Sequence, residues 1–579
     1  MEVNMDYTIL IGGEAGQGLQ TIGGALSKLL SRAGYHVFSH QDYMSRVRGG
    51  HNLYQIRFAD REITSPRSKA DILVALDLKT IELHKGELTE SGIIVYDADF
   101  IKKTFDSPEY LHVPFDKIAV ESGGSKIMSN TAAVGAVLGM IGMELTVFED
   151  IVRKAFRKKG QEVIDKNLAT ARAGHDFATR ECRRCSFVVP KTANSGYMLI
   201  NGADAIGLGA LMSGCKFYCG YPMTPSTGIL NYMGSKAIEY GVMVEQTEDE
   251  ICAINMALGA SFAGVRAMTG SAGGGFALMV EGLSLAGMVE LPIVIAVMQR
   301  PGPATGLPTR TEQGDLLFTL YAGHGEFPRA VFAPGTPEQA FYLTNKAFDI
   351  AEKYQIPSFI IADQYLVDTE WTFVGFDTKK LLYNDYRLSG DALGKTGEYK
   401  RYAYSENGVS PLAVPGLSKH LVVVDSDEHD EEGHMIEDGE TRNRMVEKRL
   451  FQKFPLIRNE ISPPEYVGPP NPEIVVAGWG STYGVIKEAV GILKDKYKIG
   501  MLHFSELYPF PGTEKFDFMS LLFEAKLTIC VENNATGQFE TLVKASTGYG
   551  FGVSIRKYDG RQFILDELIG ELDGYANRL

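Results

Sequence analysis

The stretch KFYCGYPMTPSTG, Lys216 to Gly228, places a short apolar run directly before a turn that holds two prolines, two threonines and a serine. Proline fixes the backbone φ angle, so Pro222 and Pro225 make the turn around Thr224 rigid. Ligands bind an open α/β sheet beyond the carboxyl ends of its strands. We therefore expect the Thr224 hydroxyl to face a ligand that carries carboxylate or carbonyl oxygens.

The same order of elements recurs on both sides of this stretch. From 196 to 375, apolar runs alternate with Gly-rich turns and helical patterns, which favours a doubly wound α/β domain. Residues 1–185 begin with a strand, the turn GGEAGQG at Gly12–Gly18 and a helix, and they predict a Rossmann-like domain. Residues 376–470 predict an extended connection with one polar helix, and 471–579 predict a third α/β domain. The expected fold class is multi-domain α/β.

Length and composition agree with a large acidic protein. The 579 residues exceed one hydrophobic core, which stops growing near roughly 250–300 residues, so we expect roughly two to four domains. The formal net charge of -15 argues against nucleic acid or an anionic membrane as a partner. The sequence shows neither a signal peptide nor a long uncharged apolar span, and six cysteines are too few for a disulfide framework. We expect a cytoplasmic location.

Metal binding by this chain alone is not expected. Cys182 and Cys185 form its only CxxC pair, whereas zinc and iron-sulfur sites usually need four soft ligands. Two interpretations stay open: the pair marks the edge of a linker and holds no cofactor, or it takes part in redox chemistry or a shared metal site. The acidic run DEHDEEGH at Asp427–His434 is interpreted as a solvated face, not a metal site.

Charged residues follow two further predicted strands. Arg300 stands at the end of the apolar run Leu291–Met298, separated from it by Gln299, and Arg310 lies on the same Pro- and Gly-rich loop. Arginine in that position can bind a carboxylate through two hydrogen bonds, although a salt bridge is the plainer explanation. Glu248 and Glu250 lie at the start of a predicted helix. Capping alone would explain them, but a strand end is also where ligands enter.

The turn at Gly12–Gly18 separates a strand from a helix, where backbone N–H groups can bind a phosphate. Its glycine spacing departs from GxGxxG, no convincing ribose-binding acid follows about 20 residues later, and no Gly-Lys-Ser/Thr follows. Dinucleotide and Walker-type binding are therefore poorly supported. A purely structural turn remains an alternative.

Together these motifs resemble the 2-oxoacid:ferredoxin oxidoreductases, specifically an alpha subunit with the gamma domain fused in front. The resemblance covers nearly the whole chain. The matching segments are YPMTPST (Tyr221–Thr227), EDEICAINMALGAS (Glu248–Ser261), QRPGPATGLPTRTEQGDL (Gln299–Leu316), GHGEFPR (Gly323–Arg329), DQYL (Asp363–Leu366), EHDEEGHMIED (Glu428–Asp438), ENNATGQF (Glu532–Phe539), GGEAGQGLQT (Gly12–Thr21) and RVRGGHN (Arg46–Asn52).

The resemblance implies thiamine diphosphate chemistry: decarboxylation of a 2-oxoacid, acyl transfer to coenzyme A and two electrons for ferredoxin. The fold it implies is a gamma domain, a pyrimidine-type thiamine-binding domain and a transketolase C-terminal-like domain. Glu248 best matches the family's glutamate at the aminopyrimidine ring, with Glu250 as the alternative. The implied substrate-binding residues are Thr224, Arg300 and Arg310. The implied thiamine diphosphate contacts are Tyr221, Pro222, Glu248 and Ser271. The implied coenzyme A contacts are Gly13, Glu14, Gly16, Gln17 and Gly18.

Departures from the family pattern imply a second chain. The sequence has no GDG followed by Asn to hold Mg²⁺ and the diphosphate, since the EDG at Glu437–Gly439 lies in the charged connection, and it has no CxxCxxC. The resemblance thus assigns the diphosphate, Mg²⁺ and a 4Fe-4S cluster to a beta subunit, in a dimer of heterodimers. We expect 2-oxoglutarate as substrate, with pyruvate or a branched-chain 2-oxoacid as alternatives and the direction left open. A noncatalytic assembly subunit and an unrelated nucleotide-binding protein are the rival hypotheses.

Overall fold

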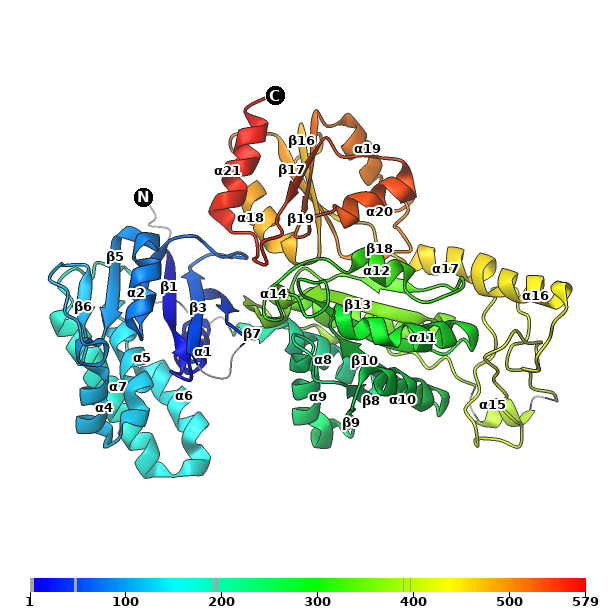
Figure 1. The fold of residues 1–579 in the computed structure, drawn as a ribbon, viewed down its shortest axis with the longest axis horizontal. Helices are drawn as coiled ribbons and strands as arrows, with labels where there is room; N and C mark the ends of the chain where they lie inside the picture. Colours follow the sequence, from blue (N-terminus) through cyan, green and yellow to red (C-terminus); the bar gives the residue numbers. More distant parts are fainter. Residues whose placement is uncertain (1–4, 46–48, 191, 193–195, 389, 396) are drawn as a thin grey trace. The chain divides into compact units, whose positions relative to one another are not determined.

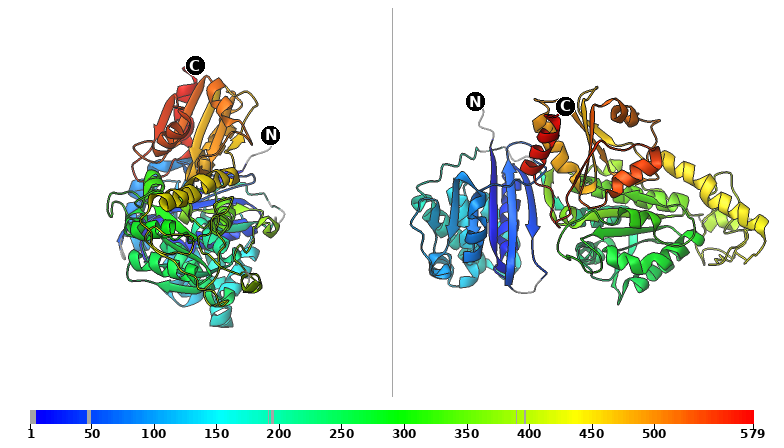
Figure 2. Two further views of the ribbon diagram at one scale, coloured as in Figure 1. Left: turned by 90° about the vertical axis from the view of Figure 1, so that its right-hand side faces the viewer. Right: turned by 45° about the horizontal axis from the view of Figure 1, so that its top comes forward.

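The computed structural model describes residues 5–45, 49–190, 192, 196–388, 390–395 and 397–579. Three sheets flanked by helices make up the fold, which confirms the multi-domain α/β prediction (Figures 1 and 2). The chain forms two compact units. Unit 1 comprises Met1–Ile200, Thr369–Gly375 and Ile564–Leu568, and unit 2 comprises Asn201–Asp368, Phe376–Phe563 and Ile569–Leu579. Two short later segments therefore belong to unit 1, which the sequence did not indicate.

Unit 1 contains an eight-stranded sheet in the order β6-β5-β4-β1-β3-β2-β14-β7. Strands β1, β4, β5 and β6 are parallel, and β3 pairs antiparallel with both β1 and β2. The strands are β1 (Asp6–Ala15), β2 (His36–Asp42), β3 (Gly49–Ala59), β4 (Ala70–Ala75), β5 (Leu88–Tyr96), β6 (Tyr110–His112), β7 (Met198–Asn201) and β14 (Glu370–Phe373). The parallel strands end at one edge, where the turn Gly12–Gly18 leads into α1 (Leu19–Arg32).

Two helices of unit 1, α5 (Ser129–Met140) and α7 (Gln161–Glu181), pack backbone to backbone. A Cβ atom at Gly135 would lie 2.0 Å from the Ala171 carbonyl oxygen, and one at Gly174 would lie 2.3 Å from the Ala132 carbonyl oxygen. Only glycine permits so close an approach, because any side chain would overlap a carbonyl of the facing helix.

Unit 2 holds a seven-stranded sheet in the order β18-β12-β13-β11-β10-β8-β9, in which only β18 is antiparallel. Helix α8 packs with α9 and α13, while α10 packs with α11, so helices cover both faces (Figure 1). The strands are β8 (Cys215–Gly220), β9 (Met243–Gln246), β10 (Arg266–Ser271), β11 (Ile293–Gln299), β12 (Ala330–Phe332), β13 (Pro357–Asp363) and β18 (Glu506–Tyr508). The helices are α8 (Gly202–Met212), α9 (Thr227–Tyr240), α10 (Glu250–Phe262), α11 (Gly273–Met288), α12 (Leu316–Tyr321), α13 (Pro337–Tyr354) and α14 (Gln364–Asp368).

The C-terminal part of unit 2 is a five-stranded sheet in the order β15-β17-β16-β19-β20. Its strands are β15 (Glu465–Val467), β16 (Ile474–Trp479), β17 (Ile499–Phe504), β19 (Leu527–Glu532) and β20 (Val553–Arg556). Its helices are α18 (Tyr483–Leu493), α19 (Phe518–Glu524) and α20 (Gln538–Thr547). Helix α21 (Leu565–Ala576) begins in the last segment of unit 1 and continues in unit 2. We call residues 471–563 the C-terminal domain below.

The connection between these two sheets contains one continuous helical run, formed by α16 (Gly439–Val446), a π-helical segment (Glu447–Gln452) and α17 (Lys453–Glu460). The wider π turn brings positions i and i+5 onto one face. Lys448 and Lys453 therefore both reach the carboxylate of Glu290, the first with Nζ 2.7 Å from Oε1. All three side chains are buried, so this ion pair fixes the run against the turn that precedes β11.

Within the part of the chain that the structure describes, no helix is both long and apolar enough to cross a membrane.

The glycine contacts of α5 and α7 make a prediction about stability. Gly135→Ala should destabilise unit 1 by about 1–3 kcal/mol, because its new methyl group would overlap the Ala171 carbonyl and push the helices apart. Gly24→Ala is the matched control. Gly24 lies in α1 with open space at its Cβ position, so alanine there should be neutral or stabilising by up to about 1 kcal/mol.

Hydrogen exchange of α5 and α7 peptides during urea unfolding of the full chain reports both variants. Equal protection of these helices in Gly135→Ala and in the wild type would contradict the contact.

Candidate active site

Four parallel strands of unit 2 end at the same edge of the sheet. Strands β8, β9, β10 and β11 end at Gly220, Gln246, Ser271 and Gln299, and the loops that follow carry most of the candidate residues. In the sheet, β8 lies between β9 and β10. The chain runs from β8 to β9 on one side and then crosses to β10 on the other side. The edge between β8 and β10 is therefore the topological switch point, where ligands of open α/β sheets bind.

The turn after β8 and the loop after β11 meet across β10. The Arg300 guanidinium donates from Nη1 to the carbonyl oxygen of Thr224 at 2.8 Å. Ser226 Oγ donates to the Met223 carbonyl at 2.7 Å, which holds the turn from within. The structure thus brings together Thr224 and Arg300, as the sequence suggested, but through the main chain of Thr224 instead of its hydroxyl. Tyr221 and Pro222 lie exposed at the start of the turn.

The two candidate glutamates differ in their surroundings. Asp249 caps helix α10 by accepting the Cys252 N–H at 2.7 Å, so capping needs neither glutamate. Glu248 is exposed, whereas the Glu250 side chain is only 2 % exposed and its Oε1 accepts a hydrogen bond from Ser271 Oγ at 2.8 Å. This buried carboxylate lies at the switch point, where ligands of open α/β sheets bind.

Glycines at the start of α11 allow two carboxylates to approach that helix end. A Cβ atom at Gly275 would lie 2.1 Å from Glu250 Oε1, and one at Gly273 would lie 2.2 Å from Asp315 Oδ2. The segment TGSAGGG therefore provides space for Glu250 and Asp315, besides supplying Ser271. Asp315 Oδ2 is buried without a hydrogen-bond partner, and burial, reinforced by Glu312 and opposed by Arg300, raises the pKa of Asp315 to about 6.

Arg310 lies further along the loop, away from the Thr224 contact. Its side chain packs against Gly560, where an added Cβ atom would lie 3.2 Å from Arg310 Cβ. Burial and the nearby Arg561 lower the pKa of Arg310. Arg300 is likewise half-buried, and burial lowers its pKa, with Asp315 acting in the opposite direction. The structure thus groups Thr224 with Arg300 and Glu250 with Ser271, and it places Arg310 beside the C-terminal domain.

In unit 1, the turn Gly12–Gly18 is held open by its own glutamine. Gln17 Oε1 accepts the Glu14 N–H at 2.6 Å, and Gln17 Nε2 donates to the Leu76 carbonyl at 3.2 Å. Gly16 and Gly18 have φ angles of 96° and 85°, and a Cβ at Gly16 would meet nothing within 4 Å. Gly16 is exposed, whereas Gly18 is half-buried and lies against the Asn130 side chain. A positive-φ backbone before a helix N-terminus can bind phosphate, and Gly16 is its open position.

The segment RVRGGHN is described only from Gly49 onward, since Arg46–Arg48 fall outside the described residues, and Gly49–Asn52 lie beside that turn on β3. Its His51 ring stacks on His84, with the two Nε2 atoms 2.8 Å apart. Burial and the neighbouring His84 lower the pKa of His51.

The cysteines and the acidic run have separate roles. Cys182 and Cys185, left open by the sequence, form a disulfide after the end of α7. In unit 2, burial raises the pKa of both Cys215 and Cys219 to about 12, which disfavours the thiolate form that ligates metals. In the acidic run, Glu428 pairs with Arg449 at 2.7 Å and also with Arg442. The side chains of Asp430, Glu432 and His434 lie close together at the partly exposed surface of this run.

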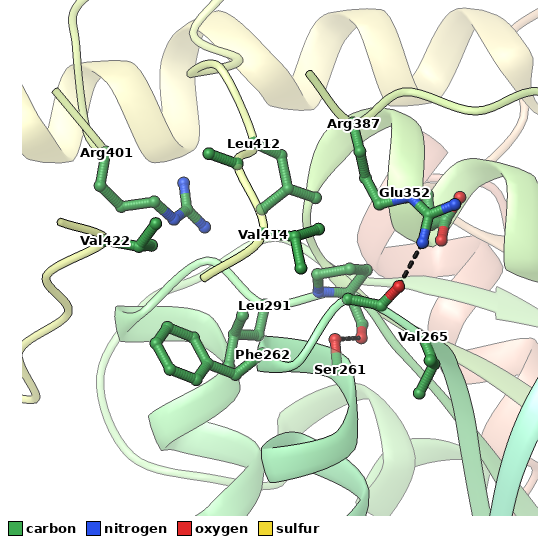
Figure 3. A pocket seen from close by; sticks show the side chains of 13 residues that line it. Ser261, Phe262, Val265, Leu291, Glu352, Arg387, Arg401, Leu412, Val414 and Val422 are labelled. Carbon is green, nitrogen blue, oxygen red and sulfur yellow. Dashed lines mark hydrogen bonds between the residues drawn. The ribbon is translucent and has the colours of Figure 1, made fainter. Parts of the chain in front are cut away.

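A separate pocket lies at the opposite end of the unit 2 sheet, before β10 and β11 (Figure 3). Val265, Leu291 and Leu412 line it, together with two arginines. Arg387 donates to the Gly264 carbonyl, and Arg401 donates to Gln355 Oε1 at 2.8 Å and to the Glu290 carbonyl at 2.7 Å. Because both arginines are engaged by the protein, we assign this pocket to packing of the connection and place the active site at the strand ends.

Comparison with known proteins identifies the class. A family model described as pyruvate flavodoxin/ferredoxin oxidoreductase, thiamine diphosphate-binding, matches residues 208–448. A second, described as pyruvate ferredoxin/flavodoxin oxidoreductase, matches residues 8–177. Unit 2 thus contains a thiamine-diphosphate-binding domain, and the class is that of thiamine-dependent oxidoreductases.

Relatives identify the family. The 2-oxoacid:ferredoxin oxidoreductase subunit alpha of Sulfolobus sp is 30% identical, over 97% of this chain and 96% of that protein. The 2-oxoglutarate oxidoreductase subunit KorA of Mycobacterium tuberculosis is 27% identical, over 88% of this chain and 83% of that protein. The structure of 2-oxoglutarate:ferredoxin oxidoreductase from Magnetococcus marinus, with 2-oxoglutarate, coenzyme A and succinyl-CoA bound, superposes with a TM-score of 0.90 at 28% identity, over 98% of this chain and 99% of that one. The chain belongs to the 2-oxoacid:ferredoxin oxidoreductase family as an alpha subunit, and it is thus one part of a multi-subunit enzyme.

Two features of the site were not singled out by the sequence. Asp315 lies in a quoted motif, but nothing in the linear pattern shows that its carboxylate is buried. The sequence does contain a signal for which of Glu248 and Glu250 is buried. Glu250 shares a helix face with the buried Ala253, Ile254 and Ala257, at spacings of three, four and seven residues, whereas Glu248 precedes the helix.

The buried carboxylate of Asp315 predicts a pH-dependent stability. Its folded pKa of about 6 exceeds the usual value of 3.8, so its stabilising contribution is present at low pH and is lost as pH rises through about 6. Asp315→Asn removes this pH-dependent loss of stability, because an asparagine side chain does not ionise. Between pH 5 and pH 7.5, the stability of the variant relative to the wild type should increase by about 1–1.5 kcal/mol.

Hydrogen exchange of α11 peptides in the full chain, measured at both pH values, gives the local unfolding free energies. A difference between variant and wild type that does not change with pH would contradict the raised pKa.

Proposed function

We propose that this chain supplies the aminopyrimidine side of the thiamine diphosphate site in a CoA-dependent 2-oxoglutarate:ferredoxin oxidoreductase. The observation that carries the proposal is the buried Glu250 carboxylate, held by Ser271 at the switch point of a domain that matches a thiamine-diphosphate-binding family. Glu250, not the exposed Glu248, is the residue that we assign to the aminopyrimidine ring. Tyr221 and Pro222 would contact the cofactor from the turn after β8.

The residues at this edge fit the pyrimidine end of the cofactor. Thiamine diphosphate, when bound, supplies the electron sink on which a 2-oxoacid is decarboxylated. Glu250 Oε1 is engaged by Ser271, so Oε2 is the oxygen that would share a proton with a ring nitrogen. The glycines of α11 let that carboxylate stay at the helix end, and the low dielectric of the buried site strengthens the hydrogen bond.

Arg300 and Thr224 are assigned to the substrate carboxylate. The hydrogen bond from Arg300 Nη1 to the Thr224 carbonyl orients the guanidinium and leaves its other N–H groups for a ligand. The attraction must stay moderate, because the bound carboxylate departs as neutral CO₂. Asp315 moderates it as an acid near Arg300. Arg310 would then contact the remote end of a longer substrate.

The sites for Mg²⁺, the diphosphate and a 4Fe-4S cluster are assigned to a second subunit, because this chain lacks the residues for them. Its sequence has no GDG–Asn pattern, and two of its four free cysteines have thiol pKa values near 12. We therefore assign Mg²⁺, the diphosphate end and a 4Fe-4S cluster to a beta subunit in a cytoplasmic dimer of heterodimers. Ferredoxin would be the electron acceptor, or the donor when carboxylation is driven in reverse. Coenzyme A would bind the Gly12–Gly18 turn through Gly13, Glu14, Gly16, Gln17 and Gly18.

The choice of 2-oxoglutarate rests on the relatives. The Magnetococcus marinus structure contains 2-oxoglutarate, and KorA proteins are among the relatives. Pyruvate and branched-chain 2-oxoacids are the alternatives within the family. A noncatalytic assembly role is disfavoured because a scaffold needs neither the buried Glu250 nor the Arg300–Thr224 contact.

A reconstitution assay tests the proposed function. The chain is expressed with and without its beta subunit, and CoA-dependent reduction of a viologen dye is measured with 2-oxoglutarate, pyruvate and a branched-chain 2-oxoacid. Activity is expected only from the pair, with the highest kcat/KM for 2-oxoglutarate. Activity of the lone chain would contradict the shared site, and inactivity of the pair with every 2-oxoacid would contradict the enzyme assignment.

The two glutamates provide a matched pair of variants. Glu250→Gln in the reconstituted enzyme should lower kcat by about 100-fold or more, because an amide cannot exchange a proton with the ring nitrogen. Glu248→Gln, an identical change on an exposed side chain two residues away, should keep kcat within about threefold of the wild type. Steady-state kinetics with each variant decide between them. The reverse ranking would move the catalytic role to Glu248.

A further inference from the structure

A buried glutamine, Gln313, helps to attach the loop that carries Arg300 to the C-terminal domain. Gln313 is 1 % exposed, and its side chain makes hydrogen bonds in two directions. Nε2 donates to the Trp479 carbonyl at 2.8 Å, and Oε1 accepts the Asn533 N–H at 2.9 Å. Its main-chain N–H donates to the Asn533 carbonyl at 2.6 Å. Gln313 therefore contacts the carboxyl ends of both β16 and β19.

The motif ENNATGQF, Glu532–Phe539, provides the other side of this contact. Glu532 Oε2 accepts hydrogen bonds from Asn534 Nδ2 and from the Phe539 N–H, both at 2.8 Å, and Asn534 Oδ1 accepts the Gly537 N–H at 2.8 Å. Glu532 and Asn534 are each 1 % exposed. These buried bonds fix the turn, so the main chain of Asn533 and the side chain of Gln538 face the loop with little freedom.

Gln538 makes a second contact to the same part of the loop. Its Oε1 accepts the Leu317 N–H at 2.9 Å, and its Nε2 donates to the Gly314 carbonyl at 2.6 Å. Helices α12 and α20 accordingly lie side by side (Figure 1). Earlier in the loop, the Thr311 N–H donates to the Gly560 carbonyl at 3.2 Å. Each of these bonds leads from residues 311–317 to the C-terminal domain.

A short path leads from Gln313 to Arg300. Two residues after Gln313, the Asp315 N–H donates to Gln299 Oε1 at 2.9 Å, and Gln299 directly precedes Arg300. The Asp315 carboxylate also acts electrostatically on the Arg300 guanidinium. Gln313 helps to fix the position of Asp315. Asp315 in turn affects the backbone next to Arg300 and the electrostatic environment of its guanidinium.

We infer that Gln313 is a positioning residue through which the C-terminal domain holds Arg300 in place for the 2-oxoacid carboxylate. The inference rests on the substrate-binding role proposed for Arg300. It gives ENNATGQF a function: the motif presents the groups that fix the substrate-binding loop of the neighbouring domain. Gln313 does not contact the substrate and acts only through Asp315 and Arg300.

Three variants of the reconstituted enzyme test the inference. Gln313→Ala should raise KM for the preferred 2-oxoacid on the order of tenfold and leave the affinity for thiamine diphosphate unchanged, because a misplaced binding group mainly weakens substrate binding. Arg300→Ala gives the upper limit of the effect on KM. Gln339→Ala is the control. Gln339 also binds a main-chain group, the Gly335 N–H at 2.8 Å, but it lies on α13 and does not contact the loop.

Gln313→Glu separates a positioning effect from a loss of packing. The glutamate keeps an acceptor for the Asn533 N–H, but its carboxylate faces the Trp479 carbonyl, and burial should raise its pKa. Its KM relative to the wild type at the same pH should therefore fall as pH is lowered, since the protonated acid can again donate to Trp479. A purely structural defect would not be relieved by acid.

Hydrogen exchange of peptides covering residues 300–315 gives a readout that does not depend on catalysis. Exchange should increase in Gln313→Ala and stay as in the wild type in Gln339→Ala. Unchanged exchange in Gln313→Ala would overturn the inference. If Arg300→Ala raises KM but Gln313→Ala increases exchange without changing KM, the inference is also overturned. If Arg300→Ala leaves KM unchanged, the proposed role of Arg300 fails, and the positioning role falls with it although the loop is loosened.

Discussion

The hydrogen bond between Ser271 and the buried carboxylate of Glu250 is the interaction on which the site depends. It joins the end of β10 to the first turn of α10, next to the switch point between β8 and β10. Placing a carboxylate there is costly unless it is paired or can take up a proton. The protein keeps Glu250 in position by two means: Asp249 takes over the capping of α10, and Gly275 removes the Cβ atom that would occupy the same space. These two features support the role proposed for Glu250 at the aminopyrimidine ring.

The second carboxylate at this edge shows how the site controls charge. Asp315 approaches the same helix end at Gly273, with one oxygen buried and unpartnered, near the half-buried Arg300. The positive potential of Arg300 is reduced by the nearby carboxylate of Asp315. This balance suits the role proposed for Arg300, because a 2-oxoacid carboxylate has to be bound in the ground state and released as neutral CO₂ in the reaction.

Much of this arrangement could be predicted from the sequence, because parallel strands align their carboxyl ends. Pro-stiffened turns after apolar runs predicted Thr224 and Arg300 at strand ends, and the family resemblance added Ser271. Helical periodicity along α10 also predicts a buried Glu250, because it lies on the face of Ala253 and Ala257, whereas the resemblance to the family motif ranked Glu248 first. Periodicity along α10 is the stronger guide, since it reports which side of the helix is buried.

Other features depend on contacts between distant segments and leave no pattern in the chain. Gln313 meets residues that lie more than 160 positions away, and a buried glutamine in a loop has no periodic signature. The disulfide of Cys182 and Cys185 is another example, because CxxC spacing is compatible with free thiols, a metal or a bond. The return of β14 to the sheet of unit 1 likewise follows from pairing with β2 and not from local propensity.

The central claim is that this chain holds only the pyrimidine side of a shared cofactor site. Calorimetric titration of thiamine diphosphate and Mg²⁺ into the chain alone, the beta subunit alone and the reconstituted pair measures it directly. The account predicts saturable binding in the pair that is at least about 100-fold tighter than in this chain alone, since one side of the site lacks the contacts to the diphosphate. Equal affinity for the lone chain and the pair would contradict it.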